Sequence, residues 1–323
     1  MKKFRIGMDV GATSIKIGLF SSDMQPVDSI QILTDRGAAL NELLAQLKSY
    51  IGRLLAKNNL TITDLSGVGA VFACRVNHQA GCLLETKYIM SISDQPMREL
   101  LEKELGVSVY IDNDANAAAL AEHTLGAGVG HDDLIYVNLS TGIGGSIIVN
   151  GKLFRGTHGL AGEVGHMLIS DSTGYPCACG ISGCVESISS GANMARYAAD
   201  RIMEGEDSSI LDYAGTTSQI DMIAVSKALR SGDALAQEVV NRGAEYLGRM
   251  FHSLNQVLDI NVFVYGGGVS KLGERFIGRI QDVYNQLNLL NRRYPALFLP
   301  AKFSNQAAMY GAALLVPSEP NHS

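Results

Sequence analysis

The sequence predicts an α/β protein of two domains, in which a duplicated mixed sheet is flanked by helices. The chain has 323 residues, more than one ordinary hydrophobic core accommodates. Short apolar runs alternate with segments whose apolar residues recur at helical spacing, as in α/β proteins. A scheme of strand, Gly/Thr hairpin and strand occurs at the N-terminus and again from Asp133, which indicates an internal duplication.

Composition narrows the class of protein. Hydrophobic residues make up 46% of the chain and charged residues 18%, as expected of a soluble globular protein. The net charge of -6 argues against a nucleic-acid-binding surface, which needs a basic patch. The charged N-terminus runs directly into Asp9 and leaves no apolar stretch for a signal peptide, and no segment is long enough to span a membrane. We expect a cytoplasmic protein without membrane or nucleic-acid partners.

The first half of the chain predicts strands followed by alternating helices and strands. Phe4–Phe20 is an apolar run, a small-residue turn and a second apolar run, which favours a hairpin. From Leu40 to Leu55 apolar residues recur at helical spacing, which predicts a long amphipathic helix. The other expected elements are strands at Val27–Leu33, Val68–Ala73 and Val107–Asp112 and helices at Met97–Leu105 and Ala115–Leu125.

The second half repeats the hairpin and then becomes mainly helical. Asp133–Asn150 predicts two strands around a turn that contains Ser140–Gly145. A strand at Asn261–Tyr265 is stopped by three glycines. The remaining elements are helices at Gly191–Met203, Met222–Leu229, Leu235–Leu258, Ile277–Leu290 and Gln306–Leu315 and a strand at Leu297–Phe303.

Three glycine-bearing turns are candidates for nucleotide binding. Glycine lets a phosphate approach backbone amides closely, and Thr13 and Thr141 add hydroxyl donors. For each of the first two turns alone, a simple tight turn of a sheet is the better explanation, but their recurrence at matching places in a duplicated scheme favours phosphate binding. The third turn, Tyr265–Val269, follows a strand and precedes a helix, which suits an adenosine that passes close to the backbone. Asp9, at the end of the first strand, could hold Mg²⁺ through water. The expected ATP-binding residues are Asp9, Gly11, Ala12, Thr13, Lys16, Thr141, Gly142, Gly144, Gly267 and Gly268.

The segment Asp112–Asn116 lies between a predicted buried strand and a helix, where ligands bind in open α/β sheets. One aspartate could accept a proton from an attacking hydroxyl. Helix capping is the alternative, because Asp and Asn are preferred N-cap residues. We choose Asp114 as the base, Asn113 as a sugar contact and Asp112 for a structural role, although spacing alone does not decide between the two aspartates.

A compact cysteine cluster lies in the stretch Gly162–Glu186. His166 precedes Cys177, Cys179 and Cys184, and one histidine with three thiolates is a closed ligand set typical of structural zinc. With all four positions filled by protein, the zinc would stabilise the loop and leave no site for an activated water. Buried free cysteines or a disulfide pair are the alternatives. Carboxylates at the two ends of the stretch, Glu163 and Glu186, would present hydrogen-bond acceptors to the hydroxyls of a sugar.

Taken together, these motifs resemble the ROK family of sugar kinases, within the actin/hexokinase/Hsp70 superfamily, over nearly the whole chain. The most specific of them is the cysteine signature. The resemblance implies an actin-like ATPase fold, of the ribonuclease H-like type, with a zinc-stapled loop. The motifs are Asp9-x-Gly11-Ala12-Thr13, Asp112–Asn116, Ser140–Gly145, Gly162-Glu163-x-Gly165-His166, Cys177-x-Cys179-Gly180-x-x-Gly183-Cys184-x-Glu186 and Gly266–Gly268.

The resemblance also implies roles for individual residues. Asp114 is the general base, and Asn113, Glu163, His166 and Glu186 bind the sugar. His166 would ligate zinc through one ring nitrogen and face the sugar with the other. A smaller lobe, residues 1–118 plus 304–318, is expected to carry the first phosphate turn and the base. A larger lobe, residues 119–303, would carry the second phosphate turn, the zinc loop and the adenosine turn.

The sequence departs from the family pattern at three places. Ala12 replaces a glycine that usually precedes the first threonine, and its small side chain leaves phosphate binding possible. Ala73–Asn77 and Thr86–Ile89 replace a Pro-Gly pair and a Pro-Asn-Leu segment, and this spelling is similar to N-acetylmannosamine kinases. The sequences Gly-Ala-Thr and Cys-Ala-Cys-Gly resemble those of the family's allose kinases instead. Arg75 and Thr86 therefore become candidate sugar contacts, with simple solvation of the arginine as the alternative.

We expect a homodimeric kinase that uses ATP and Mg²⁺ to phosphorylate a hexose or N-acylhexosamine, at the 6-hydroxyl. Non-catalytic sugar sensing is the alternative from the same family. A repressor would need an added helix-turn-helix, for which the strand at Ile6 leaves no room. An ATPase of the actin or Hsp70 type would have no use for a sugar loop.

Overall fold

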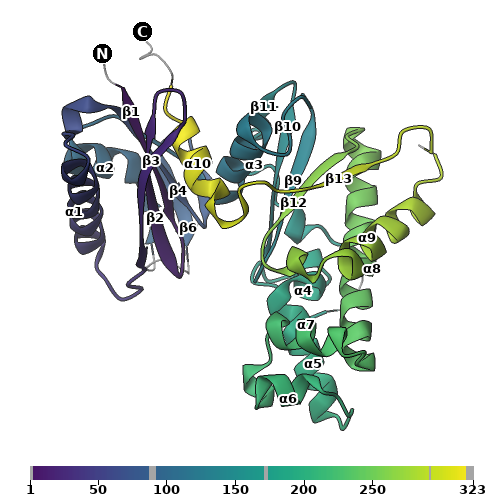
Figure 1. Cartoon of the computed structure of the whole chain (residues 1–323). Coiled ribbons are helices and arrows are strands. Elements are labelled where there is room, and N and C mark those ends of the chain that lie inside the picture. The colour runs from purple at the N-terminus through teal and green to yellow at the C-terminus, as the bar shows by residue number, and fades with distance from the viewer. Residues whose placement is uncertain (1–2, 87–91, 171–173, 291, 318–323) are drawn as a thin grey trace. The chain divides into compact units, whose positions relative to one another are not determined.

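The computed structural model describes residues 3–86, 92–170, 174–290 and 292–317 of the chain. Within these ranges the strands form two five-stranded sheets, with orders β3-β2-β1-β4-β8 and β11-β10-β9-β12-β13, and a three-stranded sheet, β5-β6-β7 (Figure 1). The two large sheets have the same order when their strands are numbered from the start of each half. The predicted duplication of a mixed sheet is therefore confirmed.

The chain divides into two compact units. Unit 1 consists of residues 1–132, 146–162 and 302–323, and unit 2 of residues 133–145 and 163–301. The expected lobes placed residues 119–132, 146–162 and 302–303 with the second unit. They lie in unit 1 because the helix Asp114–Leu125 packs along the helix Ala307–Leu314, and because Arg155 pairs with Asp112.

The first sheet combines an antiparallel hairpin with parallel strands. Strand β1 pairs antiparallel with β2 and parallel with β4, and β4 pairs parallel with β8. The strand bounds are β1 Phe4–Val10, β2 Ser14–Ser21, β3 Pro26–Leu33, β4 Leu65–Phe72 and β8 Val109–Asn113. These bounds agree with the predicted strands to within a few residues.

Helices cover both faces of this sheet (Figure 1). On one face, alternate residues such as Ile6 and Met8 pack with Leu47 of α1 (Leu40–Lys57) and Leu101 of α2 (Met97–Leu105). On the other face, α3 (Asp114–Leu125) and α10 (Ala307–Leu314) lie close together. A Cβ at Gly311 would lie 1.7 Å from the Ala117 carbonyl oxygen, so the two helix backbones approach too closely for any other residue there.

The second sheet follows the same plan. Its strands are β9 Leu134–Leu139, β10 Ile143–Val149, β11 Lys152–Leu153, β12 Val262–Gly266 and β13 Leu297–Pro300. Strand β12 pairs parallel with both β9 and β13. An aromatic cluster joins β12 and β13 to the helices α8 (Ala234–Leu258) and α9 (Glu274–Leu287), with the rings of Phe251 and Phe263 4.9 Å apart and those of Tyr284 and Phe298 5.7 Å apart.

Smaller helices complete the second unit. They are α4 Val185–Ser189, α5 Gly191–Met203, α6 Ile210–Ala214 and α7 Met222–Arg230. Helix α5 has the predicted bounds, whereas α6 was not predicted because five residues give too short a pattern. The small sheet of β5 Arg75–Asn77, β6 Cys82–Thr86 and β7 Ile92–Gln95 was not predicted either, since its strands have three to five residues.

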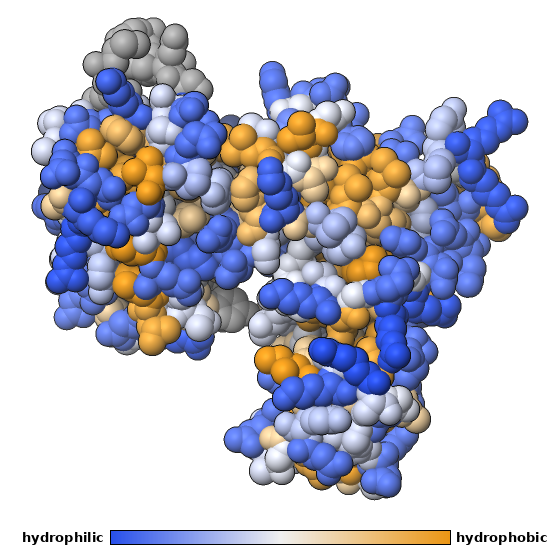
Figure 2. All heavy atoms as spheres, viewed as in Figure 1, coloured by the Kyte–Doolittle hydropathy of each residue, from blue (hydrophilic) through white to orange (hydrophobic). Residues whose placement is uncertain are grey.

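The surface in view carries many hydrophilic side chains, as expected of a chain in which 18% of the residues are charged (Figure 2). Figure 2 shows hydrophilic side chains over much of the face in view, with hydrophobic side chains interspersed. Among the described helices, none combines the length and the apolar character that a membrane span requires.

Candidate active site

The turn from β8 into α3 brings three polar side chains together in unit 1. Asn113 is the N-cap of α3, and its Oδ1 accepts hydrogen bonds from the amides of Ala115 at 2.8 Å and Asn116 at 3.3 Å. Its Nδ2 donates to the Cys74 carbonyl oxygen at 2.9 Å, which leaves one amide hydrogen for another partner. Asn113 is thus the capping residue of this segment, and it retains a donor for another partner.

The two aspartates of this turn differ in their surroundings. Asp112 is buried, with 2% of its surface exposed, and its carboxylate is paired with Arg155. Asp114 is half-buried at the first position of α3, where Oδ1 accepts from the Ala115 amide at 3.0 Å. Burial, and after it the negative charge of Asp114, raises the pKa of the Cys74 thiol to about 12, so the thiol stays protonated beside the carboxylate. This geometry gives Asp112 a structural role and leaves Asp114 the more accessible of the two.

The first glycine turn follows β1. Thr34 Oγ1 donates to the Gly11 carbonyl oxygen at 2.7 Å, and Arg36 Nε donates to the Ala12 carbonyl oxygen at 2.8 Å. Both contacts fix carbonyl groups of the turn, as does the hydrogen bond of 3.0 Å from the Thr34 amide to the Thr13 carbonyl oxygen. Neither Thr34 nor Arg36 was identified from sequence, because their separation from the turn gives no local pattern.

Asp9, at the end of β1, forms an ion pair with Lys16 of β2. The distance between Lys16 Nζ and Asp9 Oδ2 is 2.9 Å, and the two residues face each other across the antiparallel pair. Burial raises the pKa of the Asp9 carboxyl, and the Lys16 ammonium opposes this shift. The pair places a carboxylate and an ammonium directly beside the glycine turn.

Two of the predicted sugar contacts, Arg75 and Thr86, lie in the small sheet of unit 1. Arg75 is exposed at the start of β5, and Asn113 reaches the adjoining Cys74 carbonyl oxygen, so this strand is tied to the β8–α3 turn. Thr86 is the last residue of β6, but its side chain and residues 87–89 lie outside the described part of the chain.

The second glycine loop lies in unit 2 between β9 and β10. Glu186 of α4 accepts a hydrogen bond from the Ile143 amide at 2.9 Å, and a Cβ at Gly142 would lie 2.7 Å from Glu186 Oε2. The carbonyl oxygens of Ser140 and Thr141 accept from the first residues of α5, Gly191 at 2.9 Å and Ala192 at 3.2 Å. Glu186 therefore supports the loop through Oε2, a role that its position beside the cysteines does not predict.

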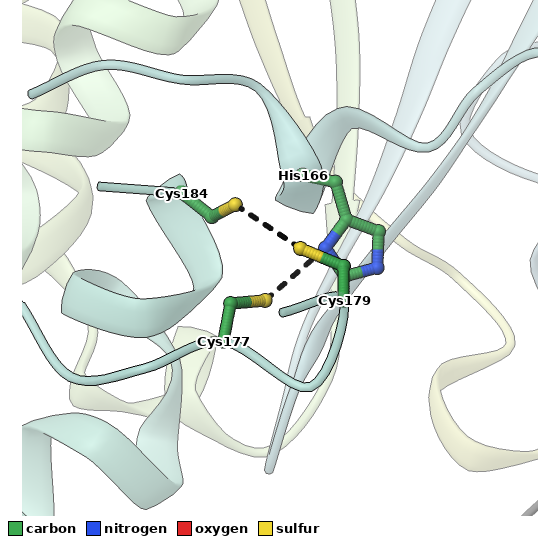
Figure 3. A group of neighbouring side chains, drawn as sticks. All are labelled: His166, Cys177, Cys179 and Cys184. Atoms are coloured by element: carbon green, nitrogen blue, oxygen red, sulfur yellow. Dashed lines mark hydrogen bonds between the residues drawn. The ribbon is translucent and has the colours of Figure 1, made fainter. Parts of the chain in front are cut away.

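The cysteine cluster is assembled in the structure as predicted from its spacing. The ligand atoms of His166, Cys177, Cys179 and Cys184 all lie within 4.8 Å of one another (Figure 3). His166 Nδ1 is 3.4 Å from Cys177 Sγ, and Cys179 Sγ is 3.6 Å from Cys184 Sγ. Tetrahedral sulfur ligands of zinc lie about 3.8 Å apart, so these residues fit such an ion. The five cysteines are free thiols, which excludes the disulfide alternative in this structure.

The two ring nitrogens of His166 face different groups. Nδ1 lies toward the cysteines, whereas Nε2 is 3.8 Å from Glu163 Oε2. Burial raises the pKa of the Cys184 thiol to about 12, and the hydrogen bond with Cys179 and the charge of Cys177 add to this shift. A divalent ion would remove this penalty by stabilising the thiolates. The cluster thus has the donor chemistry and spacing of a structural zinc site. Glu163 lies next to the ring nitrogen of His166 that does not face the cysteines.

The third glycine turn follows β12 and contains two glycines with different constraints. Gly267 has a φ of 93°, and a Cβ there would lie 2.2 Å from the Leu139 carbonyl oxygen. Gly268 has a φ of -66°, and a Cβ would meet open space. The structure therefore requires glycine at position 267 but not at position 268.

This contrast predicts different effects of alanine substitution on stability at the two positions. Gly267→Ala should lower the free energy of unfolding by roughly 1–3 kcal/mol from backbone strain alone, with the carbonyl clash in addition. Gly268→Ala should leave that free energy unchanged or raise it by up to about 1 kcal/mol. Urea unfolding of both variants checks this, and equal destabilisation of the two would contradict the described turn.

Comparison with known proteins identifies the class of protein to which the fold belongs. The sequence matches the ROK family over residues 5–319. A glucokinase from Halalkalibacterium halodurans is 32% identical over 99% of this chain and 96% of its own length, and an N-acetylmannosamine kinase from Escherichia fergusonii is 31% identical over 97% and 98%. The structure of a ROK family glucokinase from Streptomyces griseus, in complex with glucose and AMPPNP, superimposes with a TM-score of 0.81 at 30% identity, over 97% of this chain and 98% of that one.

The two duplicated α/β sheets are those of the actin-like ATPase superfamily, as expected from the sequence. Within that superfamily, the chain belongs to the ROK family.

Proposed function

We propose that this protein transfers the γ-phosphoryl group of ATP to the 6-hydroxyl of a hexose or N-acylhexosamine, with Asp114 as the general base. The observation that carries the proposal is the division of roles at the β8–α3 turn. Asp112 is committed to Arg155, and Asp114 stands half-exposed at the start of α3. Relatives named as glucokinase and N-acetylmannosamine kinase support a sugar as the acceptor.

Asp114 would accept the proton of the sugar hydroxyl as its oxygen attacks the γ-phosphorus in line. Most of the rate enhancement in phosphoryl transfer comes from positioning and from neutralisation of charge, and the base orients the nucleophile. The N-terminus of α3 favours a negative charge at this position. The protonated Cys74 thiol beside it adds no second negative charge.

Sugar binding is assigned to residues with acceptors and donors for hydroxyl groups. His166 Nε2 and the Glu163 carboxylate lie 3.8 Å apart and could contact neighbouring hydroxyls. Glu186 has a second carboxylate oxygen beyond the one that supports Ile143, and Asn113 has its remaining amide hydrogen. Arg75 and Thr86 are proposed to distinguish one sugar from another.

ATP binding is assigned to the three glycine turns. Backbone amides near Gly11, Ala12 and Thr13 would contact phosphate oxygens, as would the loop that contains Thr141, Gly142 and Gly144. The open space at Gly268 is proposed to face the adenosine. Asp9 would hold Mg²⁺ through water, with Lys16 fixing its carboxylate, and zinc would be held by His166, Cys177, Cys179 and Cys184.

Release of ADP in the presence of different sugars tests this function. The purified protein with ATP and Mg²⁺ is assayed against glucose, mannose, fructose, allose, N-acetylglucosamine and N-acetylmannosamine. We expect release that depends on at least one of them. Sugar binding without ADP release would instead favour a non-catalytic sensor, and equal release with and without sugars would indicate a simple ATPase.

A further inference from the structure

We propose that Arg155 is a positioning residue for phosphoryl transfer, because it balances the buried charge of Asp112, which in turn fixes the segment that carries Asp114. The proposal rests on the kinase function proposed above. Arg155 follows β11 and is remote in sequence from the β8–α3 turn, and no motif pointed to it.

Four donors saturate the carboxylate of Asp112. Oδ2 accepts from Arg155 Nη2 at 2.6 Å and from Nε at 3.1 Å. Oδ1 accepts from the Asn113 amide and from Asn116 Nδ2, both at 2.8 Å. A carboxylate that is 2% exposed is stable as an anion only if it is paired and hydrogen-bonded, and Arg155 provides the only positive charge among these donors.

The acceptors of Asp112 hold residues on both sides of Asp114. The Asn113 amide precedes it in the chain, and Asn116 lies one position beyond Ala115 in the first turn of α3. Asn116 is itself buried and accepts from Ser146 Oγ at 2.8 Å, so its side chain is fixed at both ends. A shift of the Asp112 carboxylate would therefore move both flanks of Asp114.

Other charged groups near this pair do not replace Arg155. Burial, followed by the charge of Arg155, lowers the pKa of the His78 imidazole, which keeps it neutral beside Asp112. Arg98 has its own partner, because its Nη2 donates to the Gln79 carbonyl oxygen at 2.7 Å. The side chain of Arg155 is 24% exposed, so its loss would also admit water to the carboxylate.

The test is a double-mutant cycle on Arg155 and Asp112. Arg155→Met leaves a buried carboxylate without its cation, and we expect kcat to fall by about 10- to 100-fold through misplacement of Asp114, with the KM for ATP unchanged. Arg155→Lys should retain more activity because it keeps the charge. Asp112→Asn should also lower kcat, since donors meet both oxygens of Asp112 and an amide nitrogen would face donors in either orientation. The double variant Asp112→Asn/Arg155→Met should be more active than the product of the two single losses predicts.

The controls separate this role from a general structural one. Arg53→Met removes an exposed arginine from α1 of the same unit and should leave kcat unchanged. Circular dichroism melts establish that each variant is folded. If Arg155→Met does not fold, the kcat values of Arg155→Lys and of the double variant test the positioning role instead.

A kcat of Arg155→Met equal to that of the wild type would overturn the proposal, as would strictly multiplicative losses in the double variant. A wild-type chain that releases no ADP with any sugar would contradict the kinase function itself, and with it a role of Arg155 in turnover.

Discussion

Asp114→Asn is expected to lower kcat by roughly 10²- to 10⁴-fold, the range that general base catalysis contributes. The amide cannot accept the proton of the sugar hydroxyl, but its oxygen can still accept the hydrogen bond from the Ala115 amide. The start of α3 should therefore be preserved, and sugar binding should remain detectable by calorimetry. Steady-state kinetics with the best sugar of the screen provide the measurement.

The matched control for this variant is Asp282→Asn, an exposed aspartate of α9. It makes the same chemical change outside the proposed site and should retain the wild-type kcat. Full activity of Asp114→Asn would remove Asp114 from the role of base. A variant that lost sugar binding together with turnover would instead show that the carboxylate binds the substrate.

Loss of the metal is expected to have the second large effect. The purified protein should contain one zinc per chain, and Cys184→Ser should lose it, with a fall in the free energy of unfolding of more than about 4 kcal/mol. Activity should be lost as well, because Cys184 is the N-cap of α4, which carries Glu186, and Glu186 supports Ile143 in the second glycine loop. Metal analysis, urea unfolding and the ADP assay provide the three measurements.

Cys82→Ser is the matched control, since Cys82 lies in β6 and outside the cluster. It should keep the zinc and the activity. A wild-type protein that is active without bound metal would contradict the assignment of the cluster as a zinc site. Retention of zinc in Cys184→Ser would show that this cysteine is not one of the ligands.

Much of the fold was predictable because its elements carry strong local patterns. The leucines of α1 recur at helical spacing, and the glycine hairpins recur in the two halves, so both the helix and the duplication follow from the sequence. The cysteine cluster was predictable for the same reason, since ligand spacing is a local property. The three strands β5–β7 were not predicted, because each is too short to show an alternation of apolar and polar residues.

The contacts that support the candidate site were not predictable, because they join residues remote in sequence. Arg155 reaches Asp112 from the loop after β11, and Thr34 reaches the Gly11 carbonyl from beyond β3. Glu186 was assigned to the sugar from its place beside the cysteines, but its bond to the Ile143 amide depends on how α4 packs. The spacing of residues in the sequence reveals metal ligands that lie within one loop. Hydrogen bonds between residues remote in sequence can be seen only in the folded chain.

The most direct test of the proposed function is the position of the transferred phosphoryl group, read by ³¹P and ¹³C NMR of the product formed from ATP and the best sugar. We expect the 6-phosphate of that sugar, formed in an amount equal to the ADP released. ADP without a phosphorylated sugar, or a phosphate on any other hydroxyl, would contradict the proposed reaction.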